Sequence, residues 1–183
     1  MPRHDHGIPP HKINHKRNNN SLKRRGIKEV IGVFSVGSLR LKIKPGSLVV
    51  PHDYINFGVI LTFSEKEVKH TIPDFYDNSR ERIIKAAGEN KIKVIKKGVY
   101  FQARGPRFET KAEINLIKHY ADIVGMTLAS EATLASEIGL NYAAICLVDN
   151  YAAGISEEKL TITKWKKGQI GNKEKVLNLL KAL

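Results

Sequence analysis

The chain has 183 residues, a length that suits one domain with a sizeable apolar core. Its apolar stretches are short and broken by charges, so the sequence predicts a soluble protein without a membrane-spanning segment. One cysteine and the lack of a signal-peptide pattern favour the cytoplasm. The net charge of +13 indicates anionic ligands, and nucleic acid, phosphate and phosphorylated metabolites all qualify.

The first half of the chain alternates between helix-like and strand-like stretches. The predicted helices are residues 14–25 and 79–90, and the predicted strands are residues 27–36 and 47–50. The first strand ends at Gly37 and Ser38, as a buried strand does where it enters a loop. Pro45 and Gly46 mark a turn before the second strand, and Ser79 is the expected cap of the second helix.

The second half continues the alternation and encloses one short loop. The predicted strands are residues 93–104, 122–126 and 142–148, and the predicted helices begin near residues 110, 131 and 173. The loop at 105–108 precedes a capping box in which Thr110 is the cap and Glu113 reaches back. We therefore expect one α/β domain over residues 1–183, with polar residues gathered at the ends of buried strands.

The basic residues lie in stretches such as LKRRGIK and ITKWKKG, where cations alternate with apolar residues. This pattern is typical of solvated helix faces. The sequence has no recognition-helix pattern, zinc-finger spacing or aromatic RNA-binding signature, so it does not favour nucleic acid as the partner. Four histidines near the start lack the spacing of a zinc site, and we expect no metal.

Five short motifs lie in loops or at predicted strand ends. They are PRH at 2–4, VGSL at 36–39, GPRFET at 105–110, VGMT at 124–127 and NYA at 150–152. In this order they resemble the purine nucleoside phosphorylases of the trimeric class that includes methylthioadenosine phosphorylase. The resemblance covers most of the chain, from Met1 to at least Ile155.

The resemblance implies a fold and a reaction. The fold would be phosphorylase/hydrolase-like, with a central mixed sheet flanked by helices and its N-terminal strand or strands missing. The reaction would be phosphorolysis, in which inorganic phosphate attacks C1′ of a purine nucleoside and releases the base. Phosphate would be a co-substrate, no cofactor would be needed, and the assembly would be a trimer or a hexamer.

Four residues are the candidates for phosphate binding. Arg3 and His4 match the PRH motif of the family, and Thr127 matches its hydroxyl donor. An Arg guanidinium can bind two phosphate oxygens at once. The chain has Phe34 where the family carries a Thr or Asn donor, so we expect the neighbouring Ser35 to donate instead.

The candidates for base recognition follow from the same resemblance. Phe108 matches the aromatic residue that packs on the purine, and Met126 matches the residue under the ribose. Glu109 and Asn150 match the catalytic pair of six-oxopurine enzymes, where the carboxylate accepts from N1 and the amide donates to N7 or O6. This pair favours inosine, guanosine or methylthioinosine. Tyr151 and Ala152 complete the substrate-binding set.

Two further residues fall near positions that contact the 5′ group of the nucleoside in the family. His70 would reach into the site of a neighbouring subunit, although an ordinary surface histidine is the interpretation that we favour. Ile162 would suit a methylthio group, although ordinary packing explains it as well.

Three hypotheses account for the start of the chain at the PRH motif, where the family has a strand and a Gly-rich phosphate loop. They are a start codon assigned too late, a shortened paralogue and a decayed gene product. Two alternative functions stay open beside phosphorolysis. One is a purine-binding protein that is catalytically impaired, and the other is a basic nucleic-acid-binding protein.

Overall fold

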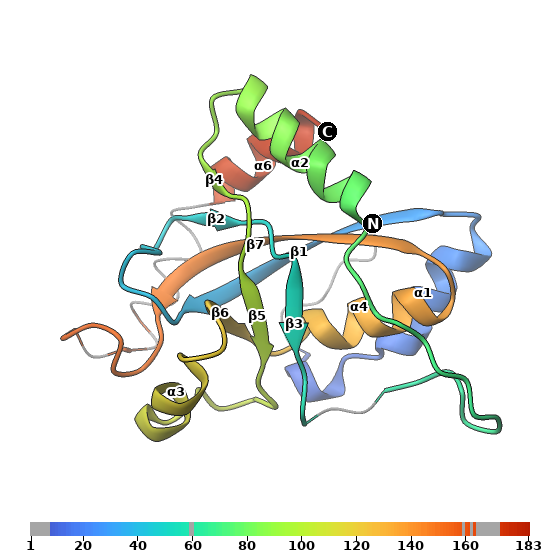
Figure 1. The fold of residues 1–183 in the computed structure, drawn as a ribbon, viewed down its shortest axis with the longest axis horizontal. Coiled ribbons are helices and arrows are strands. Elements are labelled where there is room, and N and C mark those ends of the chain that lie inside the picture. The colour runs from blue at the N-terminus through green and yellow to red at the C-terminus, as the bar shows by residue number, and fades with distance from the viewer. Residues whose placement is uncertain (1–7, 59–60, 159, 162, 164–172) are drawn as a thin grey trace.

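A computed structural model describes residues 8–58, 61–158, 160–161, 163 and 173–183 (Figure 1). Within these ranges the helical elements are η1 (Pro10–Lys12), α1 (His15–Arg24), α2 (Asp77–Glu89), α3 (Lys111–Ile117), α4 (Leu128–Glu137) and α6 (Lys173–Lys181). The strands are β1 (Glu29–Ser38), β2 (Leu48–Val49), β3 (Asp53–Ile55), β4 (Val94–Ile95), β5 (Val99–Gln102), β6 (Ile123–Gly125) and β7 (Asn141–Tyr151).

The strands form one mixed sheet of seven strands in the order β3-β5-β6-β1-β7-β2-β4. The long strands β1 and β7 run parallel along its centre, while β6 is antiparallel to β1 and β2 is antiparallel to β7. Apolar side chains in near-continuous runs explain why β7 is buried on both faces. The predicted mixed sheet with flanking helices is confirmed.

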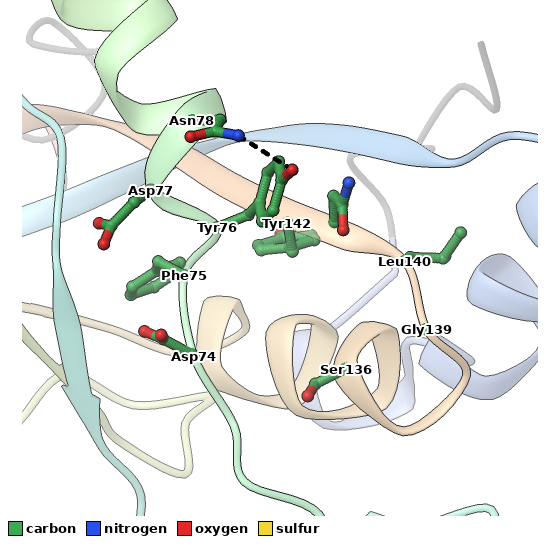
Figure 2. Close-up of a pocket in the computed structure, with 10 residues that line it drawn as sticks. Asp74, Phe75, Tyr76, Asp77, Asn78, Ser136, Gly139, Leu140 and Tyr142 are labelled. Atoms are coloured by element: carbon green, nitrogen blue, oxygen red, sulfur yellow. Dashed lines mark hydrogen bonds between the residues drawn. The ribbon is translucent and has the colours of Figure 1, made fainter.

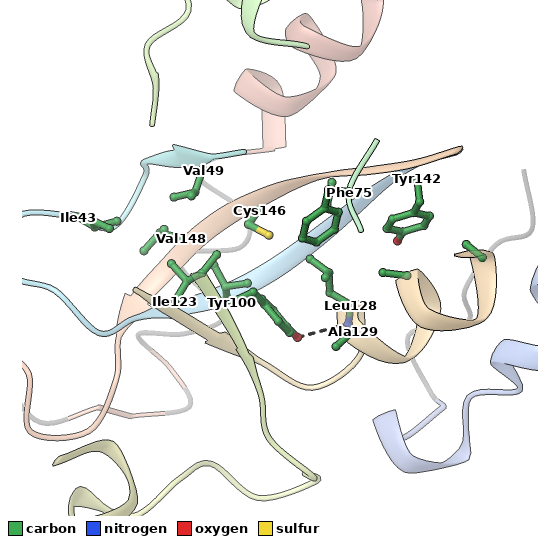
Figure 3. Packing of buried hydrophobic residues seen from close by; sticks show 14 of the residues in the cluster. Ile43, Val49, Phe75, Tyr100, Ile123, Leu128, Ala129, Tyr142, Cys146 and Val148 are labelled. Carbon is green, nitrogen blue, oxygen red and sulfur yellow. Dashed lines mark hydrogen bonds between the residues drawn. The ribbon is translucent and has the colours of Figure 1, made fainter. Parts of the chain in front are cut away.

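Helices cover both faces of the sheet (Figure 1). Apolar residues of α4 and Leu22 of α1 pack on one face, around a cluster that includes Tyr100 and Tyr142 (Figure 3). On the other face, α2 and α6 pack over β2 and β7, and α3 packs in a separate cluster beside β6. The C-terminal ends of β1 and β7 lie beside the start of β6, since Ser38 pairs with both Ile123 and Tyr151.

Several predicted elements differ in their bounds from those observed. The expected strand at 93–104 is two strands, β4 and β5, which are separated at Gly98. A Cβ at Gly98 would lie 3.0 Å from Val49 Cγ1, so glycine allows the chain to pass close to β2 there. Ser79 is not the cap of α2, because the helix begins two residues earlier and Tyr76 holds the cap position. Asp53–Ile55 was not expected as a strand, since it has no clear alternating pattern.

The buried Tyr100 hydroxyl connects β5 to the start of α4. It accepts hydrogen bonds from the backbone N–H groups of Thr127 (3.2 Å) and Leu128 (3.4 Å), the latter drawn in Figure 3. We expect Tyr100→Phe to lower the free energy of unfolding by about 1–3 kcal/mol, because both buried donors lose their acceptor. Chemical denaturation measures this change. Tyr120→Phe is the matched control on an exposed tyrosine and should stay within about 0.5 kcal/mol of wild type. Equal losses in the two variants would contradict the prediction.

Candidate functional site

A β-bulge near the C-terminal ends of β1 and β7 positions Asn150. The register shifts between Val36 and Gly37, so that Val36 faces Val148 but Gly37 faces Asn150. A Cβ on Gly37 would lie 3.4 Å from Asn150 Nδ2 and 3.3 Å from Val124 Cγ1. Glycine at this position therefore leaves room for the Asn150 amide beside β6.

Residues around Asn150 are well fixed. The side chain is 9% exposed, and its Nδ2 donates to the carbonyl of Tyr151 at 2.8 Å. The backbone N–H of Ala152 donates to Ser38 at 2.9 Å, and Ala152 is buried. The Tyr151 hydroxyl donates to the carbonyl of Leu41, so it is engaged with the loop after β1. Hydrogen bonds therefore hold the polar C-terminal end of β7 against β1 and the loop that follows β1.

The loop after β5 lies against the end of β6. Ala103 donates from its backbone N–H to the carbonyl of Gly125 at 2.8 Å, which extends the pairing of the two strands. Gly105 has a φ of 64° and precedes Pro106 through a cis peptide bond. A Cβ at Gly105 would lie only 2.6 Å from the Met126 Sδ. The predicted ribose residue Met126 therefore packs on the loop that carries the predicted base residues.

The loop is held in place from its far side by α3. Thr110 and Glu113 form the predicted capping box, with Glu113 Oε2 accepting from the Thr110 N–H at 2.7 Å. The same carboxylate binds both terminal nitrogens of Arg107, at 2.9 and 2.8 Å. Arg107 also donates to the carbonyl of Phe108 at 3.0 Å. Bidentate charge-assisted bonds of this kind fix geometry as well as add energy.

The Glu113 network predicts a pH dependence of stability. Its hydrogen bonds with Arg107 and then with Thr110 lower the pKa of Glu113 to about 2. A lowered folded-state pKa gives stability that is present above the ordinary value of 4.5 and is lost as the pH falls toward 2. We expect Glu113→Gln to melt below wild type at pH 6, and the gap to narrow between pH 4.5 and pH 2, as thermal unfolding followed by circular dichroism would show. A gap of constant size down to pH 2 would contradict this assignment.

Phe108 and Glu109 lie on this fixed loop with different exposures. Phe108 is 37% exposed, so it is only partly covered by the rest of the protein. Glu109 is half-buried, and burial is the main cause that raises the pKa of its carboxyl. A hydrogen bond with its own backbone and, to a smaller extent, the charge of Arg107 oppose this shift. Burial is the main cause that raises the pKa of Tyr100, and the Glu109 carboxylate adds a small contribution in the same direction.

The described phosphate candidates are Ser35 and Thr127. Thr127 precedes α4, and its side chain does not cap the helix, so the hydroxyl is not used for that purpose. Two side chains accept hydrogen bonds from backbone N–H groups at the start of α4. The Tyr100 hydroxyl accepts from Thr127, and Gln102 Oε1 accepts from Ser130 at 3.0 Å. The Ser35 hydroxyl donates to Asp149 Oδ2, so it cannot donate to a phosphate while that bond lasts. Both residues stay predictions.

Other predicted residues lie outside this group. Arg3, His4 and Ile162 fall outside the described residues. His70 is exposed in the long connection between β3 and α2. Where the structure describes the chain, it shows no cluster of ligands suited to a metal ion. No helix in the described ranges is long and apolar enough to cross a membrane.

Two hollows in the described surface lie away from these residues. One has a volume of about 430 Å³ and is lined by the segment before α2 and the turn after α4, with Asn78 donating to the Tyr76 hydroxyl at 3.1 Å (Figure 2). The other, of about 420 Å³, includes His52 and Asp122. Neither of these two hollows is lined by a predicted site residue.

One polar residue of this region was not singled out from the sequence. Asp149 is 4% exposed, although it carries a carboxylate, and it directly precedes Asn150. The sequence could have indicated this residue by its position, since it directly follows the apolar run YAAICLV. A carboxylate that is buried at the end of such a run needs a partner.

The mixed seven-stranded sheet flanked by helices defines an α/β protein. The family described as the phosphorylase superfamily matches residues 5–183, and the chain belongs to it. The predicted resemblance is confirmed.

Relatives and solved structures agree with this placement. A probable 6-oxopurine nucleoside phosphorylase of Archaeoglobus fulgidus is 50% identical over 153 residues, covering 83% of this chain and 63% of the relative. A probable S-methyl-5′-thioinosine phosphorylase of Thermodesulfovibrio yellowstonii is 43% identical over 165 residues, covering 86% and 62%. The methylthioadenosine phosphorylase of Schistosoma mansoni in complex with adenine superposes with a TM-score of 0.87 at 27% identity, covering 97% and 72%. The chain thus spans less than two thirds of the length of both curated relatives.

Proposed function

We propose that this protein cleaves six-oxopurine nucleosides, namely inosine, guanosine or methylthioinosine, with inorganic phosphate. The observation that carries the proposal is that the chain has both a half-buried carboxylate, Glu109, just before α3 and a buried amide, Asn150, near the end of β7, at the two positions that match the base-binding pair of six-oxopurine enzymes. The names of the two curated relatives, which specify a six-oxopurine and a thioinosine substrate, support the same class.

The chemistry of the two side chains suits a six-oxopurine base. Hypoxanthine and guanine carry a hydrogen on N1, which the Glu109 carboxylate can accept, and an oxygen at C6, to which the Asn150 amide can donate. Adenine has no hydrogen on N1 and carries an amino group at C6, so it matches neither side chain. Phe108, partly exposed on the same loop, offers an aromatic face for the ring of the base.

The reaction requires an anionic nucleophile near C1′ and stabilisation of charge that moves onto the departing base. Arg3, His4 and Thr127 would hold the phosphate, and Met126 would lie under the ribose. Asn150 would stabilise the negative charge that builds on the purine as the bond to C1′ breaks. Positioning of phosphate and nucleoside together would supply much of the remaining rate enhancement. We expect this activity in the cytoplasm, since Cys146 is a buried free thiol.

The test is phosphate-dependent release of hypoxanthine from inosine and from methylthioinosine by the 183-residue chain, with adenosine as the comparison substrate. Release that requires phosphate supports the proposal. Hypoxanthine binding without release would instead favour the purine-binding alternative. The Ser35 hydroxyl already donates to Asp149, and a site that lacks this donor to phosphate would fit that alternative. If neither release nor base binding occurs, the proposed function is wrong.

We also propose that the chain works as a homo-oligomer, a trimer or a hexamer. Three large apolar side chains between β3 and α2 are almost fully exposed: Phe57 at 86%, Val68 at 87% and Ile72 at 90%. Contact with a neighbouring subunit would remove such side chains from water. His70 lies in the same connection, so contact there would bring it to a neighbouring subunit. Light scattering after size exclusion measures the mass, and a monomer at micromolar concentration would contradict the proposal.

A further inference from the structure

Four segments of the chain meet around the second hollow, which has a volume of about 420 Å³. Its polar lining residues are Lys42 between β1 and β2, His52 between β2 and β3, Lys97 between β4 and β5, and Asp122 directly before β6. None of the residues predicted for phosphorolysis lines this hollow. Its volume falls in the range of sites that bind small molecules. The hollow is therefore a candidate site separate from the predicted one at the ends of β1 and β7.

The carboxylate of Asp122 is already engaged by groups of the protein itself. Its Oδ1 accepts from Arg40 Nε at 3.0 Å, and its Oδ2 accepts from the backbone N–H of Val99 at 2.9 Å. The positive charge of Arg40 offsets the negative charge of Asp122 at this distance. The ion pair therefore adds no net charge to the lining of the hollow.

The two lysines of the lining have no such partner. Lys42 and Lys97 are both exposed, and no ion pair within the described ranges joins either of them to a carboxylate. The lining thus keeps the charge of two ammonium groups. An anion in the hollow would be attracted by both of them.

The imidazole of His52 adds a hydrogen-bond donor to this lining. The backbone N–H of Gly98 donates to His52 Nδ1 at 3.1 Å. The Gly98 carbonyl also lies 3.1 Å from Nδ1, but it already accepts from the backbone N–H of His52. Nδ1 is therefore the acceptor for Gly98, and a neutral ring then carries its hydrogen on Nε2. This Nε2–H is a donor on a ring that lines the hollow.

One buried side chain holds the segments that carry His52 and Lys97. Arg80 is only 7% exposed, and its Nε donates to the carbonyl of Pro51 at 2.9 Å. Its Nη2 donates to the carbonyl of Lys96 at 3.0 Å. These two carbonyls belong to the residues that directly precede His52 and Lys97. A site whose backbone is fixed in advance loses less free energy when a ligand binds.

We propose that this hollow binds a small phosphate monoester. The ammonium groups of Lys42 and Lys97 and the Nε2–H of His52 donate to its phosphate oxygens. A phosphate monoester carries a charge of about −1.5 to −2 at pH 7, which matches two cations better than the single charge of a carboxylate does. Ile43 and Ile95 also line the hollow and offer apolar contact to the organic part of the ligand. The ligands are therefore phosphorylated metabolites, and this binding goes beyond the proposed function.

Isothermal titration calorimetry of the full chain with glycerol 3-phosphate, inorganic phosphate and glycerol tests the proposal, at about 0.15 M salt so that distant charges are screened. We expect glycerol 3-phosphate to bind more tightly than inorganic phosphate, and glycerol not to bind. Lys42→Gln/Lys97→Gln should weaken the binding of glycerol 3-phosphate by about 10-fold or more, because two charge-assisted hydrogen bonds are lost. Lys85→Gln/Lys181→Gln is the matched control, since it removes the same charge at exposed positions of α2 and α6, and should bind like wild type.

The outcomes decide the proposal separately from phosphorolysis. Equal affinity of wild type and Lys42→Gln/Lys97→Gln would show that the ester binds elsewhere, and a wild type that does not bind it at millimolar concentration would also overturn the proposal. Inorganic phosphate that binds as tightly as the ester would exclude the monoester as the ligand. The KM for phosphate in inosine cleavage should be the same in the double variant and wild type, and a higher KM would mean that the hollow is no separate site. If the chain cleaves no nucleoside, the proposed function fails, and the binding comparison still decides this proposal.

Discussion

Asn150→Asp should reverse the base preference of the protein, so that adenine binds more tightly than hypoxanthine. The Asn150 amide donates a hydrogen to the C6 oxygen of hypoxanthine, whereas a carboxylate repels that oxygen and accepts from the C6 amino group of adenine. A polar group that loses its partner in a buried site costs about 1–3 kcal/mol. The substitution should therefore weaken hypoxanthine binding and strengthen adenine binding. We expect the ratio of the two affinities to change by about 100-fold or more. Competition binding with the two free bases measures it.

A matched control shows whether this effect belongs to the site. Asn20→Asp makes the same change of charge at an exposed position of α1, and α1 lies far from the C-terminal ends of β1 and β7 (Figure 1). It should leave the ratio of affinities unchanged. Unaltered selectivity in Asn150→Asp would show that Asn150 does not contact the base edge. A parallel loss of both bases would indicate that the substitution damages the bulge and not the recognition.

The local elements of this site were largely predictable from the sequence. The capping box of Thr110 and Glu113 has a defined spacing, and the structure contains it. The buried runs that became β1 and β7 contain β-branched and apolar residues without helical spacing, which identifies central strands. These features depend on residues close together in sequence, and that is why sequence patterns reveal them.

Features that depend on distant residues were not predictable in the same way. The bulge that sets Asn150 opposite Gly37 arises from the pairing of two strands more than a hundred residues apart. Nothing near Asp149 in the sequence shows that Ser35 would be its partner. The division of 93–104 into two strands likewise depends on Val49 of another strand, which packs against Gly98. Register and close approach are properties of the assembled sheet.

Glu109→Gln should lower hypoxanthine affinity by about 10- to 100-fold, because a neutral amide is a weaker acceptor for the N1 hydrogen than a carboxylate. The loss should appear only where wild-type Glu109 is ionised. Burial raises the pKa of Glu109 above its ordinary value of 4.5, so wild-type affinity should fall as the pH drops through that raised pKa, and the two proteins should converge there. Equilibrium dialysis from pH 5 to pH 8 measures this. Glu89→Gln, on an exposed carboxylate of α2, is the control and should match wild type.

Glu109→Gln should preserve or raise the stability of the protein although it lowers the affinity for hypoxanthine. A carboxyl whose pKa is raised on folding binds more protons in the folded state, so it costs stability once the pH exceeds its unfolded value. Glu109→Gln removes a half-buried charge and keeps the shape of the side chain, so it should melt at or above the wild-type temperature at pH 7.5 while binding hypoxanthine more weakly. A gain in stability paired with a loss of binding is the signature of a residue kept for recognition. A loss of both would mean that Glu109 serves to hold the loop between β5 and α3, and base recognition would then have to rest on Asn150 and Phe108.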